Sequence, residues 1–66
     1  QQLLQRTVDQ LPDKFRMLII MKYYDEMSYK EIALIMKIEE KKVRSRLFEA
    51  RELLRKKLLQ HAYFSK

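Results

Sequence analysis

Three features of this 66-residue sequence predict an all-α fold, in the form of a small four-helix domain. The sequence has no glycine and one proline, so it lacks the usual residues of tight hairpin turns and of Gly-rich phosphate loops. It is rich in Leu, Met, Lys, Arg and Glu, which are strong helix formers. Its apolar residues recur at intervals of three and four residues, which is the period of a helix packed by one face.

The first helix is predicted over residues 2–10, and the second begins at Pro12. Leu4, Val8 and Leu11 follow one another at spacings of four and three, which places them on one face of a short amphipathic helix. Proline disfavours helix in the residue before it but fits the first turn of a new helix. The sequence therefore predicts two helices with a break between them.

The second helix, residues 12–24, is apolar nearly all round, and two interpretations of this remain open. It is either the central core helix or a core helix with one side exposed as a docking surface for another protein. Flexible methionine side chains suit adaptable interfaces, which favours the docking interpretation for the Met-rich side. The residues of this predicted docking surface are Met17, Ile20, Met21 and Tyr24.

The third helix is predicted over residues 28–36 by a capping signal. Ser28 stands at the cap and Glu31 three residues later, just before an apolar run, which is the pattern of a capping box. A tight turn follows, and we expect Ile38 to fill the core beneath it. Glycine is usual in such a turn, but Lys37 stands there, so the turn must use a non-glycine residue.

The fourth helix is predicted over residues 40–60, with residues 60–66 fraying. Residues 41–57 hold eight of the fifteen Lys and Arg residues and two of the nine acidic residues, so they carry 8 − 2 = +6, the whole formal charge. An apolar seam runs along the same segment at spacings of 4, 3, 4 and 4, formed by Val43, Leu47, Ala50, Leu54 and Leu58. A helix that is apolar on one face and cationic on the other favours a polyanionic partner, nucleic acid first and anionic membrane second.

A short capped helix, a tight turn and a long basic helix together predict a helix-turn-helix over residues 28–59, without wing elements. In this motif the second helix enters the major groove, so the side chains opposite the seam are candidates for base contacts: Lys41, Arg44, Ser45 and Phe48. The candidates for phosphate contacts are Tyr29, Lys30, Lys42, Arg46 and Arg51. The competing interpretation is a merely solvated charged face, with Phe48 as a core aromatic.

Several other classes of protein are disfavoured. The absence of cysteine and the single histidine predict no disulfide, no metal site and no cofactor. The chain is small for a substrate pocket, so an enzyme is the least favoured class. A membrane-surface or calmodulin-target helix is disfavoured because the apolar face of the fourth helix is narrow and already needed for the core.

The sequence resembles region 4 of bacterial sigma factors, and it is most similar to the extracytoplasmic-function (ECF) group. The resemblance covers roughly residues 8–59. It is carried by residues 11–16 (LPDKFR), 24–33 (YDEMSYKEIA), 43–51 (VRSRLFEAR) and 54–55 (LR).

The resemblance implies a domain that binds the minus-35 promoter element and docks on RNA polymerase through the flap of the β subunit. In many members it also implies sequestration by an anti-sigma factor. By position, Arg44, Ser45, Phe48 and Glu49 fall where the family reads bases. The location implied is the bacterial cytoplasm, and the chain, which begins with glutamine, is expected to be a fragment of a longer sigma factor. Two alternatives are another helix-turn-helix regulator and an interaction module bound by a regulator through its apolar second helix.

The sequence departs from the family pattern at four positions. The family often has Gly where Glu26 stands, and Pro and Gly where Glu39 and Lys41 stand. Many members have a basic residue where Glu49 stands, and a carboxylate there can accept from a cytosine amino group but cannot bind the acceptor edge of guanine.

Overall fold

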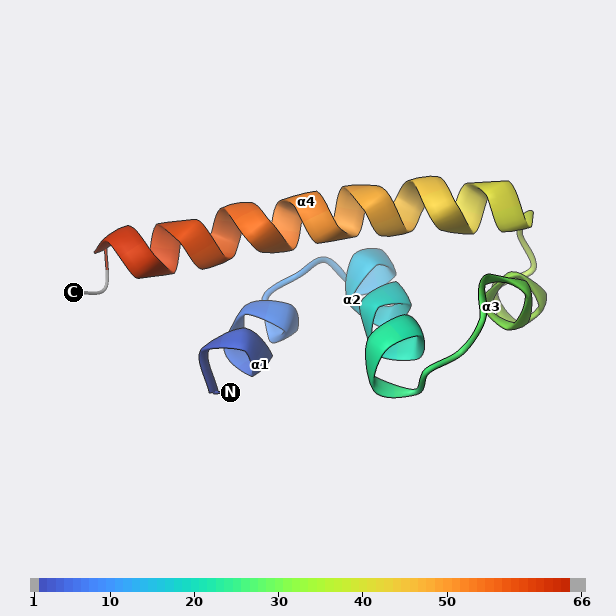
Figure 1. Cartoon of the computed structure of the whole chain (residues 1–66), viewed down its shortest axis with the longest axis horizontal. Coiled ribbons are helices and arrows are strands. Elements are labelled where there is room, and N and C mark those ends of the chain that lie inside the picture. Colours follow the sequence, from blue (N-terminus) through green and yellow to red (C-terminus); the bar gives the residue numbers. More distant parts are fainter. Residues whose placement is uncertain (1, 65–66) are drawn as a thin grey trace.

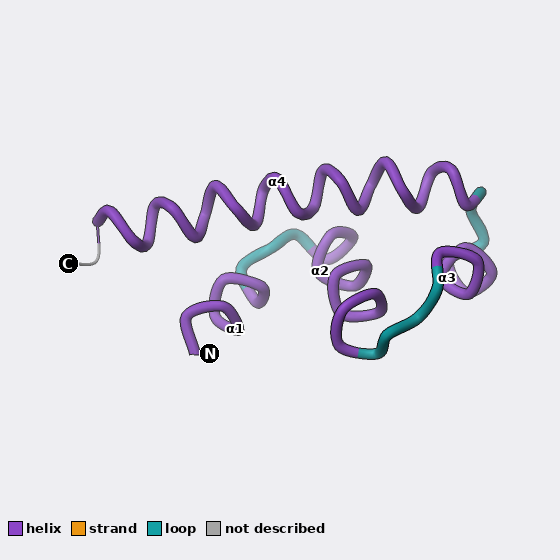
Figure 2. The backbone as a smooth tube through the Cα atoms, in the orientation of Figure 1, coloured by secondary structure: helices purple, strands orange, loops and turns teal. Residues whose placement is uncertain are grey.

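The structure, a computed structural model, describes the backbone of residues 2–64 and the side chains of residues 2–61. The four α-helices are α1 (Gln2–Asp9), α2 (Asp13–Ile19), α3 (Tyr29–Met36) and α4 (Glu40–Phe64), and α2 continues into a π-helical segment, η1 (Ile20–Tyr24). The long helix α4 runs along one side of the molecule, and the three shorter helices lie in a row against it (Figure 1). Short loops join the helices, and residues 2–64 contain no strand (Figure 2). The predicted all-α, four-helix fold is confirmed.

The core lies where the shorter helices meet α4. Its buried apolar side chains are Val8, Leu11, Leu18, Ile19, Met21, Ile32, Val43, Leu47 and Ala50. Val43, Leu47 and Ala50 belong to the predicted seam of α4 and are fully buried, and Leu54 packs partly buried against the core. Because burying one such leucine contributes about 1.5 to 3 kcal/mol, this seam holds α4 firmly to the rest of the molecule.

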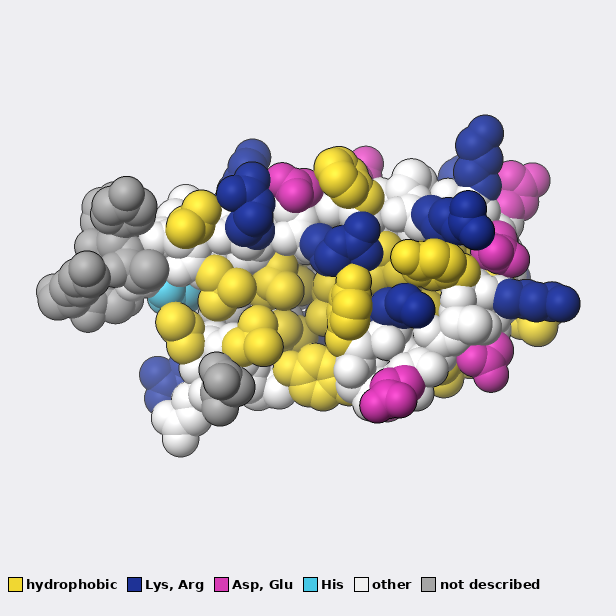
Figure 3. All heavy atoms as spheres, viewed as in Figure 1, with side chains coloured by type: hydrophobic (Ala, Val, Ile, Leu, Met, Phe, Trp, Pro, Cys, Tyr) yellow, Lys and Arg dark blue, Asp and Glu magenta, His cyan; other side chains and the backbone are white. Residues whose placement is uncertain are grey.

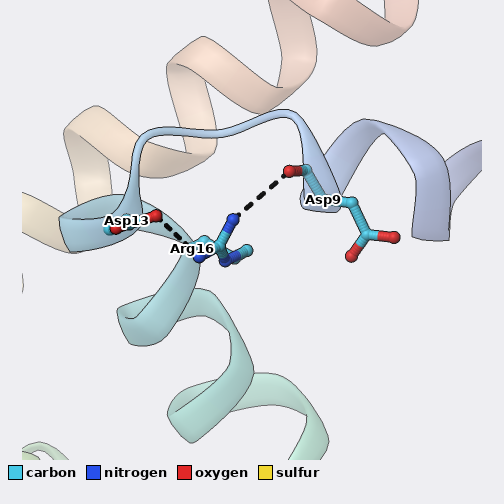
Figure 4. Close-up of polar contacts among 3 residues, drawn as sticks. All are labelled: Asp9, Asp13 and Arg16. Atoms are coloured by element: carbon cyan, nitrogen blue, oxygen red, sulfur yellow. Dashed lines mark hydrogen bonds and ion pairs between the residues drawn. The ribbon is translucent and has the colours of Figure 1, made fainter.

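The junction between α1 and α2 differs by one residue from the prediction. The helix begins at Asp13 and not at Pro12, because Pro12 has an extended ψ of 148° and takes the cap position. Arg16 forms hydrogen bonds to residues on both sides of this junction (Figure 4). Its guanidinium donates to the Asp13 carboxylate at 2.6 Å and to the carbonyl oxygen of Asp9 at 3.4 Å.

The second helix reaches Tyr24 as predicted, but its last turn is wider than an α-helical turn. The backbone N–H of Asp25 donates to the carbonyl of Ile20 at 2.9 Å, which is the i to i−5 bond of a π-helix. Glu26, directly after this turn, has a positive φ of 56°. It stands where the resemblance pointed to a glycine.

Both ends of α3 have the structure that the sequence predicts. The N–H of Glu31 donates to the Ser28 hydroxyl at 3.1 Å and the N–H of Ser28 donates to the Glu31 carboxylate at 2.8 Å, so the capping box is complete. At the other end of α3, Lys37 is left-handed, with φ 59° and ψ 43°. The Ile38 N–H donates to the carbonyl of Ala33 at 3.1 Å, a bond that closes the end of a helix around a left-handed residue. The non-glycine turn is therefore confirmed.

The fourth helix is longer than predicted. It continues to Phe64, four residues past the expected end, because the sequence after Gln60 contains neither proline nor glycine to interrupt the backbone bonds. The fraying expected from residue 60 stays a prediction, and Ser65 and Lys66 lie outside the described residues. Within residues 2–64, no helix combines the length and the apolarity that crossing a bilayer requires.

Candidate nucleic-acid interface

The first half of α4 presents an exposed stripe directly opposite its buried seam. Each residue of an α-helix turns by about 100°, so Lys41, Ser45 and Phe48 fall together on the side away from Val43 and Leu47. All three are exposed, and Phe48 keeps 58% of its surface accessible. Phe48 is therefore a surface residue and not a core aromatic.

Basic side chains line both flanks of this stripe. Arg44 and Arg51, seven residues apart, share one flank, while Lys42 and Arg46, four residues apart, share the other. Lys42 and Arg44 are exposed, and Arg46 and Arg51 are half-buried. Glu49 is exposed between the stripe and the second flank. In the space-filling view, Lys and Arg side chains gather over α4 and the α3–α4 end of the molecule (Figure 3).

Arg44 makes contacts with two neighbours. Its guanidinium carbon lies 5.3 Å from the centre of the Tyr29 ring, and its Nη2 donates to the Glu40 carboxylate at 3.4 Å. The Arg44 side chain keeps 63% of its surface exposed. The guanidinium thus retains accessible donors while its position is restricted by α3 and by the start of α4.

Arg51 is held by a residue from another part of the chain. Its Nη1 donates to the hydroxyl of Tyr23, in η1, at 2.9 Å. This hydrogen bond, with smaller contributions from charge interactions with Tyr23 and Tyr29, raises the pKa of Arg51 above its ordinary value. The hydrogen bond therefore ties the Arg51 side chain, which is cationic like any arginine, to η1.

The start of α3 supplies the remaining predicted contacts. Lys30 is exposed, and Tyr29 is half-buried, with its ring packed against the core. The ring of Tyr29 also carries a second cation, because the Lys22 ammonium lies 4.7 Å from its centre. Tyr29 therefore contacts Arg44 on one flank of α4, while Lys30 is exposed at the start of α3.

The predicted docking surface on the second helix needs one correction. Met17 and Tyr24 are each 48% exposed and Ile20 is half-buried, but Met21 is 7% exposed and belongs to the core. Met21 follows the fully buried Leu18 by three residues, so the two side chains share the inward face of the helix. Any docking surface here consists of Met17, Ile20 and Tyr24 without Met21.

Two sets of surface residues were missed by the sequence analysis. Tyr23 contacts Arg51 across 28 positions of sequence, and no local pattern signals such a pair. Leu34 and Ile35, on α3, are 72% and 55% exposed. Leu34 borders a shallow open hollow at the α3–α4 turn, which Ala33, Lys37, Ile38, Glu39 and Lys42 complete. The 3.6-residue period could have identified Leu34 and Ile35 as outward-facing, since Ile32 and Met36 point inward.

Among the described residues no group of three or more His, Asp or Glu side chains could hold a metal ion.

A capped short helix, a left-handed turn and a longer basic helix with an exposed outer stripe define the class of protein, a helix-turn-helix domain of the DNA-binding type. Residues 1–54 match the family described as Sigma-70, region 4, and the chain belongs to that family. It is 44% identical over 55 residues to the ECF RNA polymerase sigma factor SigW of Bacillus subtilis, an alignment that covers 83% of this chain and 29% of that protein. It is also 44% identical over 57 residues to the ECF RNA polymerase sigma-E factor of Escherichia coli, which covers 86% of this chain and 30% of that protein. The chain thus spans less than a third of the length of these relatives, and the resemblance predicted from the sequence is confirmed.

Proposed function

We propose that this chain is the promoter-binding part of an ECF sigma factor and that α4 reads the minus-35 element from the major groove. The observation that carries the proposal is the exposed stripe of α4, which lies between two basic flanks and opposite a fully buried seam. A major groove about 12 Å wide admits a helix of this kind. The membership of the sigma-70 region 4 family supports promoter DNA as the polyanion.

The roles of the base-reading residues follow from their chemistry. Arg44 suits bidentate donation to the O6 and N7 acceptors of guanine, and Ser45 can donate to or accept from several bases. Phe48 offers an exposed apolar surface for a thymine methyl group. The Lys41 ammonium, at the start of α4, donates to acceptor atoms on base edges. Glu49 accepts from a cytosine amino group.

Phosphate contacts fix the orientation of the helix. Lys42 and Arg46 lie on one flank of the stripe and Arg51 lies on the other. In this proposal they contact the two DNA backbones that border the groove, and Lys30 adds a contact from the start of α3. Because these contacts are electrostatic, they supply affinity without sequence preference and weaken with salt.

The partners proposed beyond DNA come from the family. The names of the relatives given above describe RNA polymerase sigma factors. We therefore propose docking of the parent protein on the RNA polymerase core through the β-subunit flap, and binding by an anti-sigma factor. A second candidate function is that of an interaction module bound by a regulator, which the half-exposed Met17 and Tyr24 favour.

Binding to two duplexes, one minus-35-like and one scrambled, across a salt series tests the proposal. We expect a steep loss of affinity with salt and a clear preference for the minus-35-like duplex. Arg44→Ala should cost about 1 to 3 kcal/mol on the preferred duplex and blur one base position. Lys42→Ala is the matched control, which should weaken both duplexes alike and reduce the salt slope by about 1. A steep slope with no preference between duplexes would contradict sequence reading and would favour the interaction module.

A further inference from the structure

Tyr29 joins three elements through its aromatic ring. It is the first residue of α3, and the Lys22 ammonium from η1 and the Arg44 guanidinium from α4 lie over its ring at 4.7 and 5.3 Å from the centre. Both distances fall within the range of about 6 Å over which the negative face of an aromatic ring attracts a cation. Tyr29 is thus the contact between the start of α3 and a predicted base-reading side chain.

The ring of Tyr29 is a fixed platform. It packs against the core, and its backbone directly follows the Ser28 cap, whose capping box with Glu31 is complete. The Lys22 ammonium, which lies over the same ring, donates to the carbonyl of Met27 at 3.4 Å and so ties the loop before α3 to η1. A ring anchored at its backbone and packed in this way has little freedom to rotate.

Arg44 has a long, mostly exposed side chain, and contact with the Tyr29 ring restricts its orientation. Its ion pair with Glu40 joins two exposed side chains at 3.4 Å, and exposed ion pairs contribute little free energy. The face of the Tyr29 ring attracts the guanidinium that lies over it, while the edge donors of the guanidinium stay available. Restricting the side chain before binding lowers the entropy lost on binding, which is the basis of preorganisation.

We infer that Tyr29 is a positioning residue for DNA recognition, whose ring holds the Arg44 guanidinium in its reading orientation. The inference rests on the proposed function, in which Arg44 reads a base. It differs from the expectation that Tyr29 contacts a phosphate, because a phosphate contact needs the hydroxyl and a platform needs the ring. The two roles therefore respond differently to the loss of the hydroxyl and to the loss of the ring.

The test combines Tyr29→Phe, which keeps the ring, with Tyr29→Leu, which removes it, and measures binding to the preferred and the scrambled duplex. We expect Tyr29→Phe to bind both duplexes as the parent chain does. We expect Tyr29→Leu to weaken the preferred duplex by roughly 2- to 5-fold, the size of an exposed cation–aromatic contact, and to leave the scrambled duplex unchanged. Tyr29→Leu should have no such effect when Arg44 is already alanine.

The matched control is the same pair of variants combined with Arg51→Ala, since Tyr29 also influences the pKa of Arg51. Coupling of Tyr29 to Arg51 and not to Arg44 would overturn the inference, as would an equal loss of affinity with Tyr29→Phe. A failure of Arg44→Ala to change duplex preference would instead refute the proposed function, so the two failures are distinguishable.

A spectroscopic measurement tests the contact without DNA. The ring current of Tyr29 should displace the Arg44 Nε–H resonance, and this displacement should persist in Tyr29→Phe and vanish in Tyr29→Leu. Thermal melting of each variant identifies any loss of fold, and if Tyr29→Leu fails to fold, Tyr29→Phe decides between ring and hydroxyl. An Arg44 resonance that does not respond to removal of the ring would overturn the inference.

Discussion

Replacing Lys37 by glycine should make this protein more stable. Lys37 holds a left-handed conformation, with φ 59° and ψ 43°, at the end of α3, and this costs an L-residue roughly 1 to 2 kcal/mol. Glycine carries no such cost but loses more backbone entropy on folding, roughly 0.5 to 1 kcal/mol. The difference between the centres of these two ranges gives an expected net gain for Lys37→Gly of about 0.75 kcal/mol.

Thermal unfolding followed by circular dichroism measures this gain. For a domain of this size, 1 kcal/mol shifts Tm by about 4 to 8 °C, so Lys37→Gly should raise Tm by about 3 to 6 °C. Lys37→Ala removes the same charge but keeps the left-handed strain, so its Tm should not rise. Lys56→Gly makes the same exchange within α4, where glycine costs about 0.8 to 1 kcal/mol, and should lower Tm.

The two glycine variants are expected to change Tm in opposite directions, Lys37→Gly upward and Lys56→Gly downward. If Lys37→Gly lowers Tm as Lys56→Gly does, the left-handed turn does not carry the strain assigned to it. If Lys37→Ala stabilises as much as Lys37→Gly, the gain comes from removing a cation, and the reasoning from backbone conformation is refuted.

Three further predictions concern the core and the capping box. Met21→Ala should cost about 2 to 5 kcal/mol, whereas Met17→Ala on the exposed side should change stability by less than about 0.5 kcal/mol; equal costs in urea unfolding would contradict the assignment of Met21 to the core. Ser28→Ala should cost about 1 kcal/mol in the same assay, and an unchanged unfolding midpoint would contradict its role as a cap. The backbone and side-chain hydrogen bonds from Ser28 lower the pKa of Glu31 below 4.5, so its stabilising effect is present above that pH and is lost as the pH falls through the lowered pKa. Glu31→Gln should remove this part of the acid dependence, and identical pH profiles of Tm for both proteins would refute it.

Much of the fold could be predicted because its determinants are local. The capping box needs Ser28 and Glu31 to be three residues apart, and the buried seam needs Val43 and Leu47 to be four apart, so both are visible in the sequence. The non-glycine turn at Lys37 was visible for the same reason. Local spacing also placed the exposed stripe of α4 on the correct side.

The remaining features depend on which surfaces meet, and local spacing does not determine this. Met21 looked like a surface residue because the second helix is apolar nearly all round, and only its packing separates the inward from the outward side. The hydrogen bond between Tyr23 and Arg51 depends on how η1 lies relative to α4, and no local pattern announces the π-helical turn after Ile19. The phosphate and base contacts proposed for α4 stay predictions, because they concern a partner.

The length of α4 has a mechanical consequence. At 1.5 Å per residue its 25 residues form one rod of about 37 Å, which accounts for most of the 41 Å long dimension of the molecule (Figure 1). The half of this rod that carries Arg44 and the half that packs against α1 are continuous, without a joint between them. A tilt of roughly 5° about one end would displace the other end by about 3 Å, which exceeds the tolerance of a hydrogen bond. α4 can therefore act as a lever, since a small tilt at the end near α1 would displace the exposed stripe at the other end by several ångströms.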